Sequence, residues 1–388
     1  MTSENMEIPF HKPYISDDEI TEVLDTLKSG WITMGPKTVK FEEEFAKYIG
    51  SKQAVAVNSG TAALHLALKA IDLQAGDEVI IPTTTFTATG EVVCYFNAKL
   101  ILVDVDKRTH NIAISEIEKA ITSKTRAIIP VHFGGQPCDM DEIKEIAKRK
   151  NLFVIEDAAH ALPAYYKTEK VGTIADITCF SFYATKPLAT GEGGMITTEN
   201  PEWTDRMKML RLHGISKDAW KRYSKGGSWY YEVTEAGFKY NMTDLQAALG
   251  LPQLRKVDGL WGRRKEIAGR YTKAFGPLKE VATPHVEPDR ETAWHLYVIK
   301  LNVEALRTDR NSFIEKLREK GIETSVHFIP LHRQPFYKNT FRYDLKDFPN
   351  AEWIYERSIS LPIYPGMKDE EVDYVIENVM DLCKTWKR

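Results

Sequence analysis

One lysine stands where an apolar stretch meets a turn of small residues. Lys186 follows the β-prone run 177–182 and precedes the turn Thr190-Gly191-Glu192-Gly193-Gly194. We therefore expect its amine at the end of a buried strand, where a small molecule can reach it. Partial burial lowers the pKa of a lysine amine and frees its lone pair, which is what a lysine that forms a Schiff base needs. A surface lysine that opens a Gly-rich loop has the same local pattern, so other residues are needed to distinguish these two interpretations.

A second segment has the features of a phosphate site. An apolar run ends at Val57, and Asn58-Ser59-Gly60-Thr61-Ala62 then opens a predicted helix. The free N–H groups and the positive dipole end of a helix N-terminus bind anions. Capping of the helix by Ser59 or Thr61 explains the same residues without a ligand, and both interpretations stay open at this point.

A carboxylate and an imidazole follow another predicted strand, residues 152–156. Asp157 and His160 lie in Glu156-Asp157-Ala158-Ala159-His160, and ligands of open α/β sheets bind outside the carboxyl ends of strands. A carboxylate there can stabilise the protonated nitrogen of a pyridine cofactor, and His160 can donate to an oxygen of the same ligand. Helix capping by Asp157 and core packing of His160 are the structural alternatives.

An aromatic ring completes the set. Phe86 lies in Thr83-Thr84-Thr85-Phe86-Thr87-Ala88-Thr89, directly after the predicted strand 78–81 and Pro82. The ring can stack on a flat heterocycle or belong to the core. A phosphate cradle, a stacking ring, a carboxylate and a lysine, each after a strand, are the four contacts that pyridoxal 5′-phosphate (PLP) needs. Their combination predicts a PLP site.

The elements that would position these residues alternate between strand and helix. The candidate strands, continuous apolar runs typical of strands buried on both faces, are 54–57, 78–81, 100–105, 127–131, 152–156, 177–182 and 194–197. Helices are expected at 17–29, 61–71, 85–96, 115–122 and 140–150. This alternation predicts an α/β fold with a mostly parallel sheet covered by helices.

The pattern changes after residue 200. An ordered loop is expected at 220–231, then helices at 243–253 and 257–275. The remainder has strand-like runs at 295–301 and 323–328 and helices at 310–320 and 369–384. Because 388 residues exceed one ordinary core, we expect two closely coupled domains. These are a large cofactor-binding domain with an N-terminal arm, 1–255, and a smaller α+β domain, 256–388.

Composition excludes several partners. The formal net charge of −3 argues against nucleic acid and anionic membranes as main partners. No run reaches the roughly 18 apolar residues of a membrane span, and the first residues show no secretory signal. The four cysteines have no CxxC spacing, so neither disulfides nor a metal site is expected. These features predict a cytoplasmic protein.

The chain also resembles a known family, the DegT/DnrJ/EryC1/StrS nucleotide-sugar aminotransferases. The resemblance covers nearly the whole chain. It rests on the motifs at residues 29–36, 59–64, 85–89, 103–106, 130–133, 156–160, 181–194, 239–248 and 294–296. It implies the type I PLP-dependent aminotransferase fold and a homodimer with active sites at the subunit interface.

Residue by residue, the resemblance implies that Lys186 binds PLP covalently and that Asp157 pairs with the pyridine nitrogen. It implies that His160 contacts the phenolic oxygen and that Phe86 stacks on the ring. The phosphate contacts would be Gly60, Thr61, Ala62 (through its N–H), Ser181, and Asn241 from the neighbouring subunit. Taken alone, Asn241 reads as a helix N-cap.

Within the family, the turn 190–194 is similar to that of enzymes that aminate C4 of a keto sugar. Residues 213–241 resemble UDP-4-amino-4-deoxy-L-arabinose synthases, whereas 326–332 resemble 6-deoxy-4-keto-sugar aminotransferases. The resemblance thus implies transfer of an amino group from L-glutamate to C4 of a nucleotide-linked, UDP-carried keto sugar. The other product is 2-oxoglutarate, and the amino sugar would serve a surface glycan such as lipopolysaccharide. Candidate substrate contacts, each also explicable as a buried structural residue, are Trp31, Tyr183, His327 and His332.

Three alternatives would use the same scaffold. The enzyme could act at C3 of a 3-keto sugar, or the chain could be a non-catalytic sugar-nucleotide-binding protein on the same scaffold. The related sugar dehydratases use pyridoxamine phosphate and have histidine where this chain has Lys186, so the lysine argues for amination. A non-catalytic protein is expected to have lost Lys186 or Asp157, and both are present.

Overall fold

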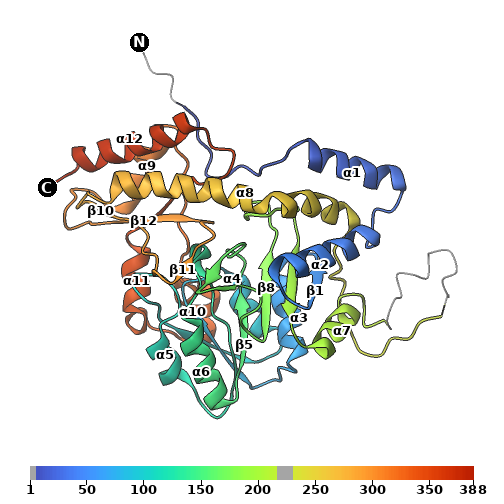
Figure 1. Ribbon diagram of the computed structural model, residues 1–388. Coiled ribbons are helices and arrows are strands. Elements are labelled where there is room, and N and C mark those ends of the chain that lie inside the picture. Colours follow the sequence, from blue (N-terminus) through green and yellow to red (C-terminus); the bar gives the residue numbers. More distant parts are fainter. Residues whose placement is uncertain (1–5, 216–229) are drawn as a thin grey trace.

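The computed structural model describes residues 6–215 and 230–388, and its centre is a seven-stranded sheet of order β1-β9-β8-β5-β4-β2-β3 (Figure 1). The antiparallel strand β9 pairs with β1 and β8, and the other strands share one direction. The strands are β1 Gln53–Val57, β2 Glu78–Pro82, β3 Lys99–Val103, β4 Thr125–Ile128, β5 Phe153–Asp157, β8 Ile177–Ser181 and β9 Gly194–Thr198. The predicted α/β fold with a mostly parallel sheet is confirmed.

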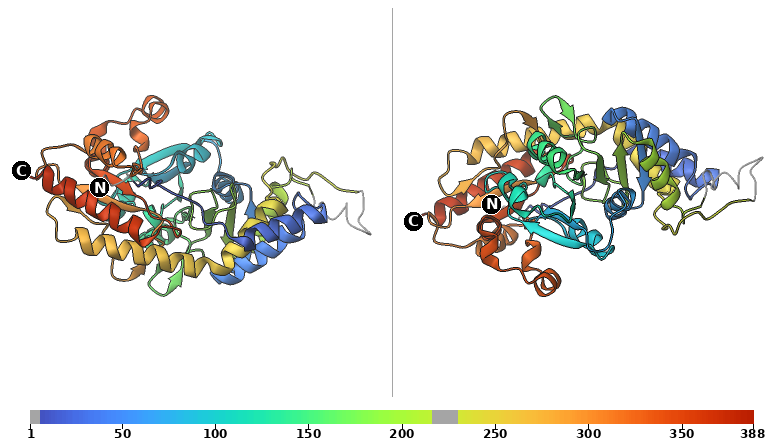
Figure 2. Two further views of the ribbon diagram at one scale, coloured as in Figure 1. Left: turned by 90° about the horizontal axis from the view of Figure 1, so that it is seen from above. Right: turned by 90° about the horizontal axis from the view of Figure 1, so that it is seen from below.

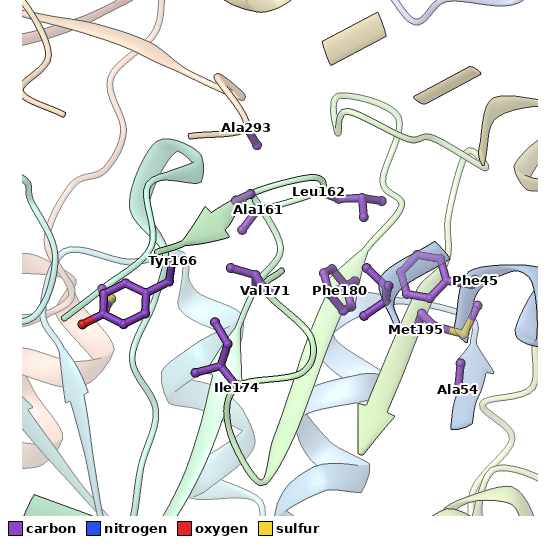
Figure 3. Close-up of a cluster of buried hydrophobic side chains, with 14 of the residues drawn as sticks. Phe45, Ala54, Ala161, Leu162, Tyr166, Val171, Ile174, Phe180, Met195 and Ala293 are labelled. Atoms are coloured by element: carbon purple, nitrogen blue, oxygen red, sulfur yellow. The ribbon is translucent and has the colours of Figure 1, made fainter. Parts of the chain in front are cut away.

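Helices cover both faces of this sheet because its strands are apolar on both sides. In β1, Ala54 and Ala56 belong to one hydrophobic core, and Val55 and Val57 belong to the other, as the two-residue period of a strand requires. Figure 3 shows part of the first core, in which Phe45, Phe180 and Met195 pack together. The covering helices are α2 Pro36–Ile49, α3 Gly60–Ala70, α4 Thr87–Cys94, α5 Ile114–Ala120, α6 Met140–Lys150 and α7 Pro201–Leu210.

A single helix of 32 residues, α8 Asp244–Phe275, replaces the two helices predicted at 243–253 and 257–275. Pro252 lies inside it, and a proline normally interrupts a helix because it lacks an N–H group. Here Leu251, Leu254 and Val257 are buried on either side of the proline, so tertiary packing stabilises a continuous helix across it. The boundary predicted at 255/256 falls within α8, which runs across the upper part of the molecule, below α12, in Figure 1.

The C-terminal part contains a second, three-stranded antiparallel sheet of β10 Val281–Ala282, β12 Tyr297–Leu301 and β13 Ser358–Leu361. The strand predicted at 323–328 is wrong. One isolated bridge occurs there, between Ser325 and Ser360, and the strand beside β12 is β13. The helices of this part are α9 Arg310–Glu319, α10 Pro335–Phe341, α11 Pro349–Tyr355 and α12 Asp369–Thr385.

The N-terminal segment extends from the C-terminal part of the molecule to the opposite end of α8. Ile8 pairs with Ile322 of the C-terminal part, and α1 Asp17–Ser29 then packs along the opposite end of α8 (Figure 2). A capping box of Ser16 and Glu19 begins α1, and Gly30 ends it in the left-handed conformation with φ 73°. A small sheet of β6 Tyr165–Tyr166, β7 Glu169–Lys170 and β11 Arg290–Glu291 lies apart from the main one.

The predicted loop at 220–231 lies outside the described residues, apart from Tyr230 and Tyr231, as does part of the segment 213–241. None of the helices in the described ranges combines the length and the apolar character needed to cross a membrane.

Candidate active site

A cavity of about 520 Å³ opens at the carboxyl ends of β5 and β8. The structure brings to it most of the residues that the sequence singled out, although they come from five separate segments. The predicted residues in its lining are Gly60, Thr61, Phe86, Asp157, His160, Ser181, Tyr183, Lys186 and His327. This is the position at which α/β sheets bind ligands.

The turn between β1 and α3 forms one end of the cavity. Ser59 is the N-cap of α3 and accepts a hydrogen bond from the N–H of Ala62 at 3.0 Å. A Cβ atom on Gly60 would lie 2.8 Å from Cβ of Ser181, and one on Gly194 would lie 2.5 Å from the carbonyl oxygen of Ser59. Only glycine permits this approach, so the helix N-terminus and the Ser181 hydroxyl converge on one place. Ala62 does not line the cavity, since Ser59 covers its N–H.

Lys186 lies in a turn after β8, in which its N–H donates to the carbonyl of Tyr183 at 2.8 Å. Burial lowers the pKa of its amine from 10.5 to about 8, and the Asp157 carboxylate opposes this shift. A larger fraction of the amine is therefore unprotonated near neutral pH than in an exposed lysine. This is the charge state in which an amine attacks a carbonyl group.

Asp157 is the last residue of β5 and is buried. Its Oδ2 accepts a hydrogen bond from the hydroxyl of Thr89 at 2.8 Å, and its Oδ1 accepts one from the N–H of Ala159 at 3.1 Å. Burial raises the pKa of Asp157, and these two hydrogen bonds and the charge of Lys186 oppose the rise. A cation bound beside Asp157 would favour the ionised carboxylate further.

His160 is held in one tautomer. Its Nδ1 accepts a hydrogen bond from the N–H of Gly134 at 3.3 Å, which leaves the proton on Nε2. Burial keeps the pKa of His160 well below 6.5, with Lys186 and His327 acting in the same direction. A neutral imidazole thus lines the cavity with one N–H to donate.

Comparison with known proteins agrees with this geometry. Residues 13–380 match the model of the DegT/DnrJ/EryC1/StrS aminotransferase family. The chain belongs to this family. The predictions of a type I aminotransferase fold and of a PLP-dependent transaminase are thereby confirmed.

Individual relatives cover almost the whole aminotransferase chain. The uncharacterized protein MJ1066 of Methanocaldococcus jannaschii is 57% identical over 372 residues, which are 96% of either chain. The spore coat polysaccharide biosynthesis protein SpsC of Bacillus subtilis is 51% identical over 378 residues, 97% of either chain. Among solved structures, the PLP form of Spr1654 from Streptococcus pneumoniae, a proposed sugar aminotransferase, is 37% identical with a TM-score of 0.91 and covers 98% of this chain and 99% of its own. Its PMP form superimposes equally well, with a TM-score of 0.91.

Among the residues of the aminotransferase cavity that sequence reasoning missed are Phe10, His11 and His295. His11 donates through Nε2 to the carbonyl of Ala184 at 3.1 Å, two residues before Lys186, and Phe10 stacks on His327 with ring centroids 5.5 Å apart. Burial, helped by the charge of Arg264, lowers the pKa of His11 to about 4. His295 lies 4.3 Å from His160, ring to ring. The only signal for any of these residues was the family motif at 294–296.

Besides Ala62, three predicted residues lie outside this cavity: His332, Trp31 and Asn241. His332 is fully buried elsewhere. Its Nδ1 is hydrogen-bonded to the hydroxyl of Thr83 at 2.7 Å, and its Nε2 is hydrogen-bonded to the carboxylate of Glu352 at 2.8 Å. Its ring stacks on Phe348. Both of its ring nitrogens have partners within the protein, which favours a structural role for His332 over contact with a substrate. Trp31 donates to the carbonyl of Met34 at 3.0 Å. Asn241 forms a bridge with Val57 and donates to the carbonyl of Met242 at 3.3 Å.

Proposed function

We propose that this protein transfers the amino group of L-glutamate to C4 of a nucleotide-linked 4-keto sugar, with UDP as the carrier and PLP as the cofactor. The observation that carries the proposal is the single cavity in which Lys186, with its lowered pKa, and the buried carboxylate of Asp157 occur together. SpsC is a polysaccharide biosynthesis protein by name, and Spr1654 is a proposed sugar aminotransferase. Both support a sugar substrate, and the name of SpsC supports a role in making a surface polysaccharide.

The residues of the cavity fit PLP. The exposed ring of Phe86 lies on the cavity wall, where it would stack on the pyridine ring, and Asp157 would keep the ring nitrogen protonated. His160 would donate its Nε2–H to the phenolic oxygen. Thr61, Ser181 and the first N–H groups of α3 would hold the phosphate, at the place where Gly60 lets these segments converge.

When bound, PLP supplies an electron sink for the charge that develops on a carbon losing its proton. Lys186 would move that proton, first at the α-carbon of L-glutamate and later at C4 of the sugar. Tyr183 and His327 line the same cavity and are the residues that we propose to contact the sugar. Burial lowers the pKa of His327 to about 4, and its Nδ1 lies 2.8 Å from the Ser360 hydroxyl. It would therefore meet the substrate as a neutral imidazole.

We further propose a homodimer in which Asn241 and Trp31 serve the neighbouring site. In support, neither side chain lines the cavity of its own chain. Asn241 nevertheless lies beside the end of β1, next to the turn that opens α3. The oligomeric state in solution and the PLP content of an Asn241→Ala variant test this part separately.

The test of the whole proposal is a panel of UDP-, GDP- and dTDP-linked 4-keto sugars incubated with L-glutamate. We expect a mass shift for an amino sugar and the appearance of 2-oxoglutarate, strongest with a UDP-linked sugar and absent with Lys186→Ala. NMR of the product distinguishes C4 from C3. A protein that takes up PLP but aminates no sugar of the panel would remove the substrate assignment and leave the cofactor assignment standing.

A further inference from the structure

A short chain of buried hydroxyl groups leads to Asp157. The hydroxyl of Thr85 lies 2.8 Å from that of Thr89, and Thr89 lies 2.8 Å from Oδ2 of Asp157. Thr85, Thr89 and Asp157 are 2%, 0% and 6% exposed, respectively. The motif that contains both threonines was singled out in the sequence for Phe86 alone, and the proposed function assigns them no part.

The direction of these hydrogen bonds follows from the charge of the carboxylate. An ionised carboxylate only accepts hydrogen bonds, so Thr89 must donate its one hydroxyl proton to Asp157. Thr89 then has no proton left for Thr85, and Thr85 must be the donor to Thr89. The two dipoles therefore point the same way, with their positive ends toward Asp157, and a bond of this kind to a charged group is stronger than one between neutral groups.

The remaining contacts leave Asp157 one orientation. Its other oxygen, Oδ1, accepts from the N–H of Ala159 at 3.1 Å, so each carboxylate oxygen carries one bond. Lys186 and His132 lie near enough to favour the charged form, but burial opposes it. Burial also keeps the neighbouring thiol of Cys179 neutral, since its pKa lies well above 9. Thr89 is the only side chain that bonds Asp157 among the described residues.

We propose that Thr89, supported by Thr85, is a positioning residue that fixes the Asp157 carboxylate in the orientation and charge state required by the cofactor's pyridine nitrogen. The inference rests on the PLP binding in the proposed function, and it goes beyond that function in naming what controls the carboxylate. Thr89 is completely buried and, unlike Asp157 and Thr85, does not line the cavity, so it would act on the cofactor through Asp157.

The test compares near-isosteric variants, since Thr→Val removes a hydroxyl and keeps the shape. The matched control is Thr84→Val. Thr84 is 1% exposed in the same segment, and its hydroxyl has no hydrogen-bond partner among the described residues. Two quantities are measured on each purified full-length protein. They are the dissociation constant of PLP and the pH at which PLP labelled with ¹⁵N at the pyridine nitrogen loses its proton, read by NMR.

We expect Thr89→Val to weaken PLP binding about tenfold. It should also lower the pH of nitrogen deprotonation by about one unit, because a carboxylate that is no longer held in place pairs less well with the protonated nitrogen. Thr89→Ser restores the hydroxyl. It should return both equilibrium constants, for PLP binding and for proton loss, to within about twofold of the wild type. Thr85→Val should shift the same two equilibrium constants in the same direction as Thr89→Val, but by a smaller factor of about threefold. Thr84→Val should change neither.

Several outcomes overturn the inference. These are an unchanged nitrogen titration in Thr89→Val, a failure of Thr89→Ser to restore it, or an equal loss of PLP binding in Thr84→Val, which would indicate packing alone. Wild-type protein that binds no PLP would overturn this inference together with the proposed function. Wild-type protein that binds PLP but aminates no sugar would leave the comparison of variants fully informative, so the two failures are distinguishable.

Discussion

His160 accepts a hydrogen bond from the backbone N–H of Gly134 at 3.3 Å, although 26 residues separate them in the chain. Gly134 has a positive φ of 63°, a conformation that glycine adopts without strain. It therefore places its N–H where it binds Nδ1 of His160 and fixes the proton on Nε2. A backbone turn thus decides which ring nitrogen of His160 can donate a hydrogen bond into the cavity.

The first prediction concerns this donor. His160→Ala should weaken PLP binding about tenfold, because a hydrogen bond to the phenolic oxygen is lost. His160→Gln places an amide N–H near the position of Nε2 and should recover most of the affinity. Titration of the apoprotein with PLP, followed by fluorescence, measures both. Equal losses in the two variants would mean that His160 supports the cavity by packing rather than by donation.

The second prediction concerns pH. Burial lowers the pKa of Lys186 to about 8, and an amine attacks a carbonyl only when it is unprotonated. The rate at which the apoprotein captures PLP should therefore rise with pH through a midpoint near 8. Visible absorbance after mixing at pH 6 to 10.5 gives the profile, and Lys186→Ala should show no capture. A midpoint near the ordinary value of 10.5 would contradict the buried setting of the amine.

The third prediction concerns stability. Arg211 and Glu42 form a buried ion pair, and Arg211 also donates to the carbonyl of Ala56 at 2.6 Å. Because removal of one partner leaves an unpaired buried charge, Arg211→Met should lower the free energy of unfolding by about 3 to 5 kcal/mol. Arg255→Ala is the control, since its pair with Glu44 is largely exposed and should contribute less than about 1 kcal/mol. Urea unfolding of both variants measures these free energies. A small loss in Arg211→Met, similar to that in Arg255→Ala, would contradict a stabilising role of the buried pair.

The fourth prediction tests the reassignment of His332. Its hydrogen bonds to Thr83 and Glu352 are internal to the protein, so His332→Ala should destabilise the fold by about 2 to 5 kcal/mol through lost bonds and a new cavity. It should leave the KM for the keto sugar within about twofold, since His332 does not line the cavity. Thermal unfolding and steady-state kinetics give the two values. A large rise in KM at unchanged stability would restore the residue to the substrate site.

The sequence by itself determined the strands of the main sheet and the residues at their carboxyl ends. Buried parallel strands need uninterrupted apolar residues, and that pattern is local, so 54–57, 78–81 and 177–182 were found with small errors at their ends. Asp157 is the last residue of β5, and Phe86 and Lys186 lie in the turns that follow β2 and β8. Parallel strands bring their carboxyl ends to one edge of the sheet. The candidate site could therefore be assembled without coordinates.

Only the tertiary structure decided which distant segments meet. His11 reaches the carbonyl of Ala184 across 173 residues, and nothing local in the N-terminal segment distinguishes it from an ordinary polar residue. The packing around Pro252 continued α8, and β13, which was not predicted, pairs with β12, because partners far along the chain outweighed local propensity. His332 carries the same side chain as His160, but its partners are Thr83 and Glu352 instead of the cavity. A side chain's type comes from the sequence, whereas its surroundings come from non-local packing.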